Sequence, residues 1–333
     1  MRVAYIAETS LDNRSAYTHH VIKMCDAFST KNCKTTLIIP SIDKRISFKK
    51  IKKSFLLTSK NKFLIKKILS FKVSNFLTRI LFGFKVANHL RKNCPELIIT
   101  RSFISSIFFT FFKINHFLEI HSEFRGLTRF FMINLNFLNS RYVLKIILIS
   151  KALNKRIFKL NKKKFLILHD AVDIKNFKNK KFKNKIKIAT YVGSFYKGKG
   201  VEFIFELSKI LPKVKFYLYG DINTLDDRFK NNKQNKNLIF RNHIEYSQIP
   251  KTLAKFEIIL MPYSKKVYVK SKSIEVGQYM SPLKLFDYFY KKINPNKYKK
   301  QENYREYMTY SQNKMNLKKI IYLHLTKKIL LRI

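Results

Sequence analysis

The sequence of 333 residues is poor in several residue types: it has no tryptophan, seven glycines, seven prolines and three cysteines. Cys25, Cys33 and Cys94 are odd in number and lack metal-ligand spacing, which predicts neither a disulfide framework nor a cysteine-bound zinc ion. The longest apolar run, residues 103–112, ends at Lys113 and is shorter than the roughly 20 residues that a membrane-spanning helix needs.

The amino terminus does not resemble a secretory signal. Glu8 stands where the apolar core of such a signal would have to continue. Few unpaired cysteines also favour a reducing compartment. These features predict a cytoplasmic protein.

Acidic residues are few. The sequence has 20 Asp and Glu and 69 Lys and Arg, which gives a formal net charge of +49. A basic nucleic-acid-binding module is one interpretation, and it predicts steeply salt-dependent binding. However, the lysines are spread along the chain, and no zinc spacing, RNP-like string or basic zipper accompanies them. We therefore expect no specific nucleic-acid partner.

Lysine clusters at residues 44–53 and 60–67 have two interpretations. They are either solvated helix faces or a basic amphipathic surface that rests on anionic lipid. The charge of the chain would attract an anionic membrane surface, so a peripheral position on the inner membrane face is an open prediction.

Apolar runs alternate with helical patterns in the first half of the chain, which predicts a doubly wound α/β domain over residues 1–165. A helix is expected from Ser15, whereas residues 42–93 show only weak helical periodicity. The predicted strands are residues 2–7, 35–40, 96–100, 117–121 and 144–150.

A second α/β pattern follows a connector at residues 166–187, and it predicts a partial domain over residues 188–289 with a parallel sheet. Two Rossmann-like domains facing across a cleft are expected. The predicted strands are residues 187–192, 215–219, 237–241 and 257–262, and the predicted helices are residues 201–211 and 246–255.

The string YVGSFYKGKG at residues 191–200 joins a strand to a helix. Such a turn presents free backbone N–H groups and positive potential, which suits a phosphate. Alternatively, Gly193, Gly198 and Gly200 merely supply positive φ angles for a tight connection. Lys197 and Lys199 add cations in the first interpretation.

The string MSPLKLFDYF at residues 280–289 predicts a second anion-binding helix start. Ser281 is a good N-cap and Pro282 suits the first helical position, so free N–H groups from Leu283 onward would face a ligand beside Lys284. Asp287, one turn on, could accept hydrogen bonds from ribose hydroxyls, or could be an ordinary exposed acid.

Five strings in order resemble glycosyltransferase family 4, which has the GT-B fold, from residue 2 to about residue 289. They are HDAVD at 169–173, YVGSFYKGKG at 191–200, YLYGD at 217–221, LMPYSKKVYVKSKS at 260–273 and MSPLKLFDYF at 280–289. The resemblance implies retaining transfer of a sugar from a nucleotide-sugar donor to a glycan or lipid-linked acceptor, in cell-surface polysaccharide synthesis. It implies no cofactor beyond the nucleotide-sugar co-substrate.

The resemblance also assigns roles to single residues. His121 matches the catalytic cleft histidine, Lys199 the lysine at the donor phosphates and Asp287 the second acid of the E-x7-E pattern. Arg14 and His20 are candidates on the acceptor side. No D-x-D string is present, and no metal site is predicted.

The sequence departs from the family pattern at several positions. Ser194 replaces a frequent arginine, Tyr279 replaces the first acid of E-x7-E with Glu275 out of register, and Asp287 is shorter than the usual glutamate. Residues 290–333 form an atypical Lys-rich tail, which is either a divergent helical segment or the product of a changed reading frame. If the reading frame has changed, the chain is a truncated, inactive relative of such a glycosyltransferase.

Overall fold

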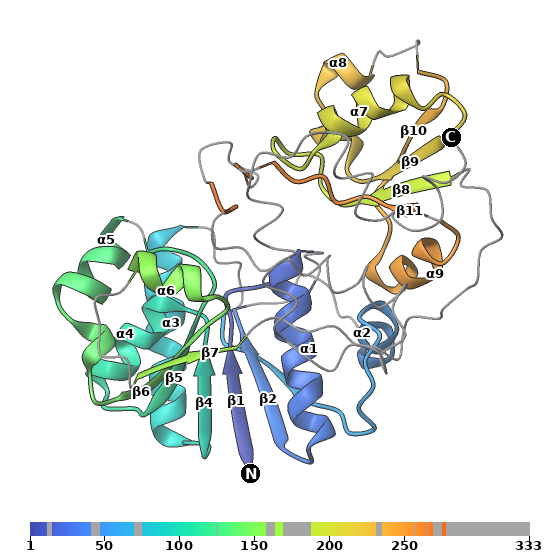
Figure 1. The fold of residues 1–333 in the computed structure, drawn as a ribbon. Coiled ribbons are helices and arrows are strands. Elements are labelled where there is room, and N and C mark those ends of the chain that lie inside the picture. The colour runs from blue at the N-terminus through green and yellow to red at the C-terminus, as the bar shows by residue number, and fades with distance from the viewer. Residues whose placement is uncertain are drawn as a thin grey trace, which may run out of the picture. The chain divides into compact units, whose positions relative to one another are not determined.

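A computed structural model describes residues 1–11, 15–40, 47–69, 75–124, 126–157, 164–168, 188–230, 235–256, 258–264, 266–268 and 275–277. The chain divides into two compact units, and each has its own parallel sheet (Figure 1). Several predicted features lie outside the described residues. These are Arg14, the string at 169–173, Tyr279, Ser281, Pro282, Leu283, Lys284, Asp287 and the tail at 290–333.

The first unit contains a seven-stranded sheet in the order β3-β2-β1-β4-β5-β6-β7, and all its neighbouring strands are parallel. The strand order reverses between β1 and β4, which is where doubly wound proteins bind ligands at the carboxyl ends of their strands. The strands are β1 (Arg2–Ile6), β2 (Lys34–Ile39), β3 (Leu64–Lys67), β4 (Leu97–Thr100), β5 (His116–Ile120), β6 (Val143–Leu148) and β7 (Phe165–Ile167).

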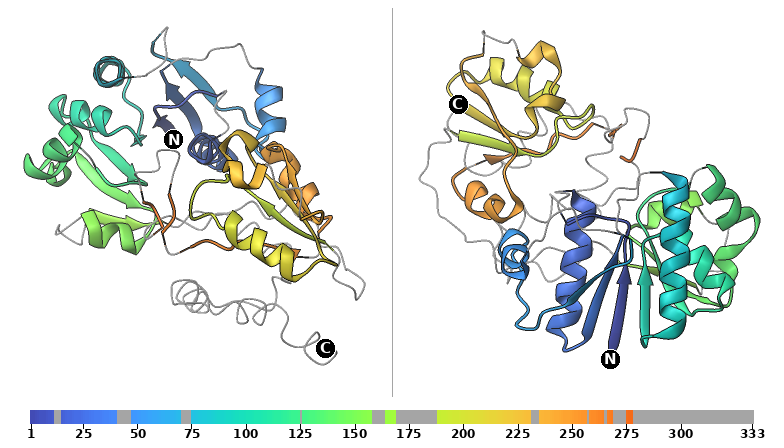
Figure 2. Two further views of the ribbon diagram at one scale, coloured as in Figure 1. Left: turned by 90° about the horizontal axis from the view of Figure 1, so that it is seen from above. Right: turned by 180° about the vertical axis from the view of Figure 1, so that it is seen from behind.

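Helices cover both faces of this sheet (Figure 2). The alternation of side chains along β1 agrees with this, because Tyr5 packs in the same core as residues of α1, whereas Ala4 and Ile6 pack in the same core as residues of α3. The helices are α1 (Ala16–Thr30), α2 (Phe48–Ser54), α3 (Phe76–Lys92), α4 (Phe103–Phe111), α5 (Gly126–Arg129) and α6 (Lys151–Ile157), with a π-helical turn at Phe130–Asn134 and a 3₁₀ turn at Phe137–Asn139.

Two helices that begin near the carboxyl ends of the strands, α1 and α4, have side-chain caps. Ser15 accepts a hydrogen bond from the backbone N–H of Thr18 at 3.2 Å, which confirms the predicted start of α1. Ser102 caps α4 through the N–H of Ser105 at 3.0 Å. These caps fix the first turns of two helices beside the switch point.

The region at residues 42–93 differs from the weak helical pattern expected for it, because it contains the edge strand β3 between α2 and α3. An edge strand has little buried surface, and Lys66 and Lys67 of β3 are exposed. Charged residues are common on sheet edges, so the strand carries no apolar run that a sequence pattern could reveal. At the far edge, β7 extends the sheet two residues beyond position 165.

The second unit contains a four-stranded parallel sheet in the order β10-β9-β8-β11. Its core includes Tyr191, Ile204, Phe216 and Leu218. The elements from residue 188 onward are β8 (Ile188–Val192), α7 (Val201–Ile210), β9 (Lys215–Tyr219), α8 (Asp227–Lys230), β10 (Leu238–Arg241), α9 (Ile249–Leu253) and β11 (Ile258–Ile259), with 3₁₀ turns at Ile222–Thr224 and Tyr246–Gln248. Of these, the turn at Tyr246–Gln248 and the first two residues of α9 belong to the first unit, which includes Ile244–Pro250.

Two predictions for this part of the chain were too long. The helix expected at residues 246–255 is a 3₁₀ turn followed by the short α9. Among the described residues of the strand expected at 257–262, β11 covers two, and one further backbone hydrogen bond joins Leu260 to Thr190. Within the described residues, no helix has the length and apolarity required to cross a lipid bilayer.

Candidate functional site

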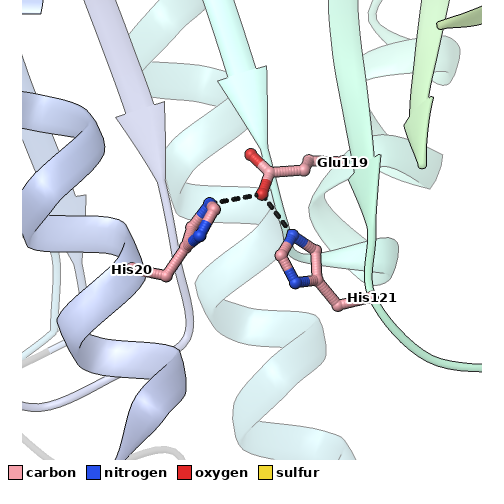
Figure 3. Close-up of side chains that lie close together, drawn as sticks. All are labelled: His20, Glu119 and His121. Carbon is pink, nitrogen blue, oxygen red and sulfur yellow. Dashed lines mark hydrogen bonds and ion pairs between the residues drawn. The ribbon is translucent and has the colours of Figure 1, made fainter. Parts of the chain in front are cut away.

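A cluster of polar side chains lies at the carboxyl end of β5, around the carboxylate of Glu119 (Figure 3). His20, on α1, places Nε2 at 2.8 Å from Glu119 Oε1. His121, directly after β5, brings its own Nε2 into hydrogen-bonding contact with the same oxygen. The structure thus joins two histidines that the sequence suggested separately.

Tyr5 and Arg101 complete the surroundings of this carboxylate. The Tyr5 hydroxyl donates a hydrogen bond of 2.5 Å to Glu119 Oε2, and Arg101 Nε lies 3.8 Å from Oε1. Arg101 also places its guanidinium carbon 4.2 Å from the ring centre of Tyr17. The side chains of Arg101 and Glu119 are only 4% and 3% exposed, so this charge pair is buried.

The charge state of the cluster follows from its contacts. Burial by itself would raise the pKa of Glu119, but hydrogen bonds from His121 and His20 and the charge of Arg101 outweigh it and hold that pKa well below its usual value. Burial also lowers the pKa of His121, although Glu119 opposes the shift. At neutral pH we therefore assign an ionised carboxylate and a neutral imidazole.

This assignment fixes the tautomer of His121. An ionised carboxylate can only accept hydrogen bonds, so the proton between Glu119 and His121 must lie on Nε2. The lone pair of the neutral ring is then on Nδ1. A histidine held in this way can accept a proton or a hydrogen bond from a hydroxyl group, in the manner of a general base oriented by a carboxylate.

The buried arginine is a second source of hydrogen bonds. Arg101 Nη1 is buried and has no hydrogen-bond partner among the residues that the structure describes. A buried donor without a partner is costly, which suggests that a ligand oxygen completes its hydrogen bonding. The cluster thus offers an acceptor at His121 and a donor at Arg101.

His20, Glu119 and His121 could also hold a metal ion, since their ligand atoms lie within 4.8 Å of one another. However, the Nε2 atoms that face the carboxylate would have to lose their protons to bind a cation. The guanidinium of Arg101, 3.8 Å from Glu119 Oε1, would repel the ion. The donor set fits a hydrogen-bonded cluster better, and the prediction of no metal stays a prediction.

Glu119, Tyr5 and Arg101 were not predicted as site residues. One signal was present in the sequence: Glu119 interrupts an apolar strand and lies two positions before His121, on the same face of that strand. An ionised acid in a buried strand requires partners. The partners themselves come from β1 and from the end of β4, which no local pattern could identify.

The second candidate region is the Gly-rich turn between β8 and α7. Gly198 and Gly200 have φ angles of 83° and 88°, and a Cβ atom on them would lie 2.0 Å from the carbonyl oxygen of Lys266 and 2.1 Å from that of Pro262. Packing therefore requires glycine at both positions, as predicted by the interpretation in which the glycines supply positive φ angles for a tight connection. This requirement does not depend on a phosphate.

Lys199 is the charged group of this turn that is best placed to bind a ligand. Its Nζ lies 4.4 Å above the ring of Tyr263, and burial lowers its pKa to about 8. No ion pair joins it to a carboxylate in the described residues. Lys197 in the same turn is exposed.

The helix that follows the turn also lacks a cap. α7 begins after Gly200, and in the described part of the chain no side chain caps its first turn. The N–H groups of that turn therefore carry positive potential beside the partly buried ammonium of Lys199. Gly193, Lys197 and Lys199 lie together in this turn, as the sequence suggested.

No protein-family model and no curated protein matches the sequence. Solved structures do match. Three of them each cover 79% of this chain. Anabaena HepE in complex with UDP has 11% sequence identity and a TM-score of 0.56, with 74% of that chain covered, and a glycosyltransferase from Rickettsia africae has 12% identity and a TM-score of 0.57, with 73% covered. Sucrose-phosphate synthase from Thermosynechococcus elongatus has 13% identity and a TM-score of 0.57, with 75% covered.

Identities this low show similarity of fold. The two parallel Rossmann-like sheets match structures of GT-B glycosyltransferases, which confirms the predicted fold class. Membership of glycosyltransferase family 4 in particular stays a prediction.

Proposed function

We propose that this protein is a glycosyltransferase that moves a sugar from a nucleotide-sugar donor to a glycan or lipid-linked acceptor. The observation that carries the proposal is the partly buried ammonium of Lys199 beside the uncapped start of α7. Burying a charge without a counter-charge is unfavourable. A donor diphosphate would supply that counter-charge and accept hydrogen bonds from the free N–H groups.

The structural neighbours support this choice of ligand. HepE is described in complex with UDP, a nucleoside diphosphate, and shares the fold of this chain. In the proposal, Gly193 and Lys197 help to surround the donor phosphates. Ser281, Pro282, Leu283, Lys284 and, for the ribose, Asp287 complete the donor site, although they lie outside the described residues.

The cluster around Glu119 is proposed to act on the sugar. His121 Nδ1 accepts a hydrogen bond from a sugar hydroxyl, while Glu119 holds the ring in place. Arg101 Nη1 donates to an oxygen of the donor or acceptor. His20 contributes on the acceptor side, as does Arg14 outside the described residues. We further propose a retaining reaction without a metal, at the cytoplasmic face of a membrane.

The test is consumption of a nucleotide-sugar. The full chain is incubated with UDP-, GDP-, ADP- and CMP-sugars and a lipid extract as acceptor, and the released nucleotide is measured. We expect release from one class of donor, with product in which the anomeric configuration of the donor is retained. Release from no donor would contradict the proposal and favour the inactive relative.

A further inference from the structure

The helices α3, α4 and α5 of the first unit, together with the π-helical turn, carry an unusual amount of exposed apolar surface. Fourteen large hydrophobic side chains are exposed in the described part of the chain, and eight of them belong to residues 76–135. Seven of these eight define what we call the apolar face: Phe76, Leu77, Leu81, Phe84, Phe111, Leu127 and Phe130.

Contacts connect the four phenylalanines of the apolar face, since Phe130 also packs on Phe131 at a centroid distance of 5.8 Å. Phe76 of α3, Phe111 of α4 and Phe131 of the π-helical turn line a single hollow of about 160 Å³, and every lining residue except Thr128 is apolar. Phe84 reaches the same hollow through the ring of Phe108, at a centroid distance of 5.9 Å. Contiguous apolar patches of this kind mark interaction sites on folded proteins.

The charges on the three segments that carry this face are of one sign. Residues 76–92, 103–111 and 126–134 contain no Asp or Glu. We call five exposed basic side chains that lie within these segments or shortly after them the basic border. They are Arg79, which pairs with Glu8 at 2.9 Å, and Lys85, Arg91, Lys113 and Arg129.

We propose that the apolar face is a docking surface for an anionic phospholipid bilayer. Its hydrophobic side chains would enter the boundary between headgroups and acyl chains, and the basic border would lie at the level of the headgroups. Each lysine or arginine near such a surface strengthens binding by about fivefold. Charge complementarity therefore favours anionic lipid as the occupant.

Other occupants fit the charge less well. A second copy of this chain would bring the same basic border against itself. The Lys-rich segment at residues 290–333 is also basic and would be repelled in the same way. The inference deepens one part of the proposed function, the position at a membrane face. Its test does not depend on sugar transfer, because vesicle binding is measured without donor or acceptor.

The test compares two double variants of equal charge in a vesicle flotation assay. Leu77→Glu/Leu127→Glu alters the apolar face, where these side chains are 73% and 59% exposed. The control, Leu64→Glu/Ile210→Glu, alters side chains that are 69% and 63% exposed on β3 and α7. Both pairs lower the net charge by the same amount, and all four side chains are exposed, so melting curves should match the wild type.

We expect the wild type to bind vesicles of phosphatidylglycerol and phosphatidylcholine, and to bind pure phosphatidylcholine more weakly. The apolar-face variant should lose at least about tenfold in affinity and the control less than about twofold. Equal losses would show that net charge alone drives binding and would overturn the proposal. The proposal would also be overturned if the wild type bound no vesicles or bound both vesicle types equally. It would be overturned as well if the apolar-face variant turned a dimer into monomers but kept the vesicle affinity of the wild type.

Discussion

The Glu119→Gln variant is expected to transfer sugar about 10²- to 10⁴-fold more slowly than the wild type. Glutamine keeps the size of the side chain, but it removes the negative charge that holds the proton of His121 on Nε2. Its amide N–H₂ group can face the ring instead, which favours the opposite tautomer. The measurement is the initial rate of nucleotide release at saturating donor.

The same variant should lose stability, because Arg101 then stays buried without its counter-charge. Removing one partner of a buried pair costs about 3–5 kcal/mol, which urea unfolding would detect. A double variant, Glu119→Gln/Arg101→Met, removes both charges and should recover part of this loss. It should not recover the rate, which separates the role in the reaction from the role in folding.

Tyr5→Phe provides a graded comparison. It deletes the 2.5 Å hydrogen bond to Glu119 Oε2 but leaves the carboxylate charged and His121 in place. We expect a loss of about tenfold in rate, far smaller than that of Glu119→Gln. Equal rates for wild type and Glu119→Gln would contradict the role assigned to this cluster.

The Lys199→Met variant is expected to bind the donor nucleotide about 10- to 100-fold more weakly than the wild type. Methionine keeps the apolar stem over the ring of Tyr263 and removes only the ammonium. A hydrogen bond to a charged group typically contributes about 1.5–3 kcal/mol, which sets the size of the effect. Calorimetric titration at pH 7 measures it.

The affinity for the donor nucleotide should change with pH in one direction. Burial lowers the pKa of Lys199 to about 8 in the free protein, and a bound phosphate would raise it by favouring the ammonium. Binding above pH 8 must therefore take up a proton, so affinity should fall by up to about tenfold per pH unit above 8. Below pH 8 this group is already protonated and contributes no slope.

The control is Lys209→Met, which removes an equal charge from the other end of α7. Lys209 is exposed and pairs with Glu206 at 3.0 Å. Its replacement should change neither the affinity nor the slope above pH 8. If both lysine variants weakened binding equally, the effect would come from the general charge of the chain.

Much of the fold could be predicted because its signals are local. Ser15 caps α1 through its own first turn, and the Gly-rich turn lies between a strand and a helix that each have a clear apolar pattern. β3 gave no such signal because it is a charged edge strand, and β11 pairs over only two residues. Short and exposed elements depend on their neighbours more than on their own residues.

The candidate site was predictable only in part. His121, His20 and Lys199 follow recognisable strand ends or helix starts. Glu119 and Arg101 come together through sheet pairing between β4 and β5, and Tyr5 reaches across from β1. Contacts between residues about 20 to 115 positions apart follow from topology, which a single sequence does not display.

Hydrogen exchange on the full chain, with and without nucleotide, tests the central claim most directly. UDP, GDP and ADP are each compared with their own nucleoside, so that only the diphosphate differs. For the diphosphate that binds, we predict slower exchange of backbone amides at residues 193–203, and no such protection by the nucleoside. Binding of a diphosphate with unchanged exchange at these residues would contradict the account.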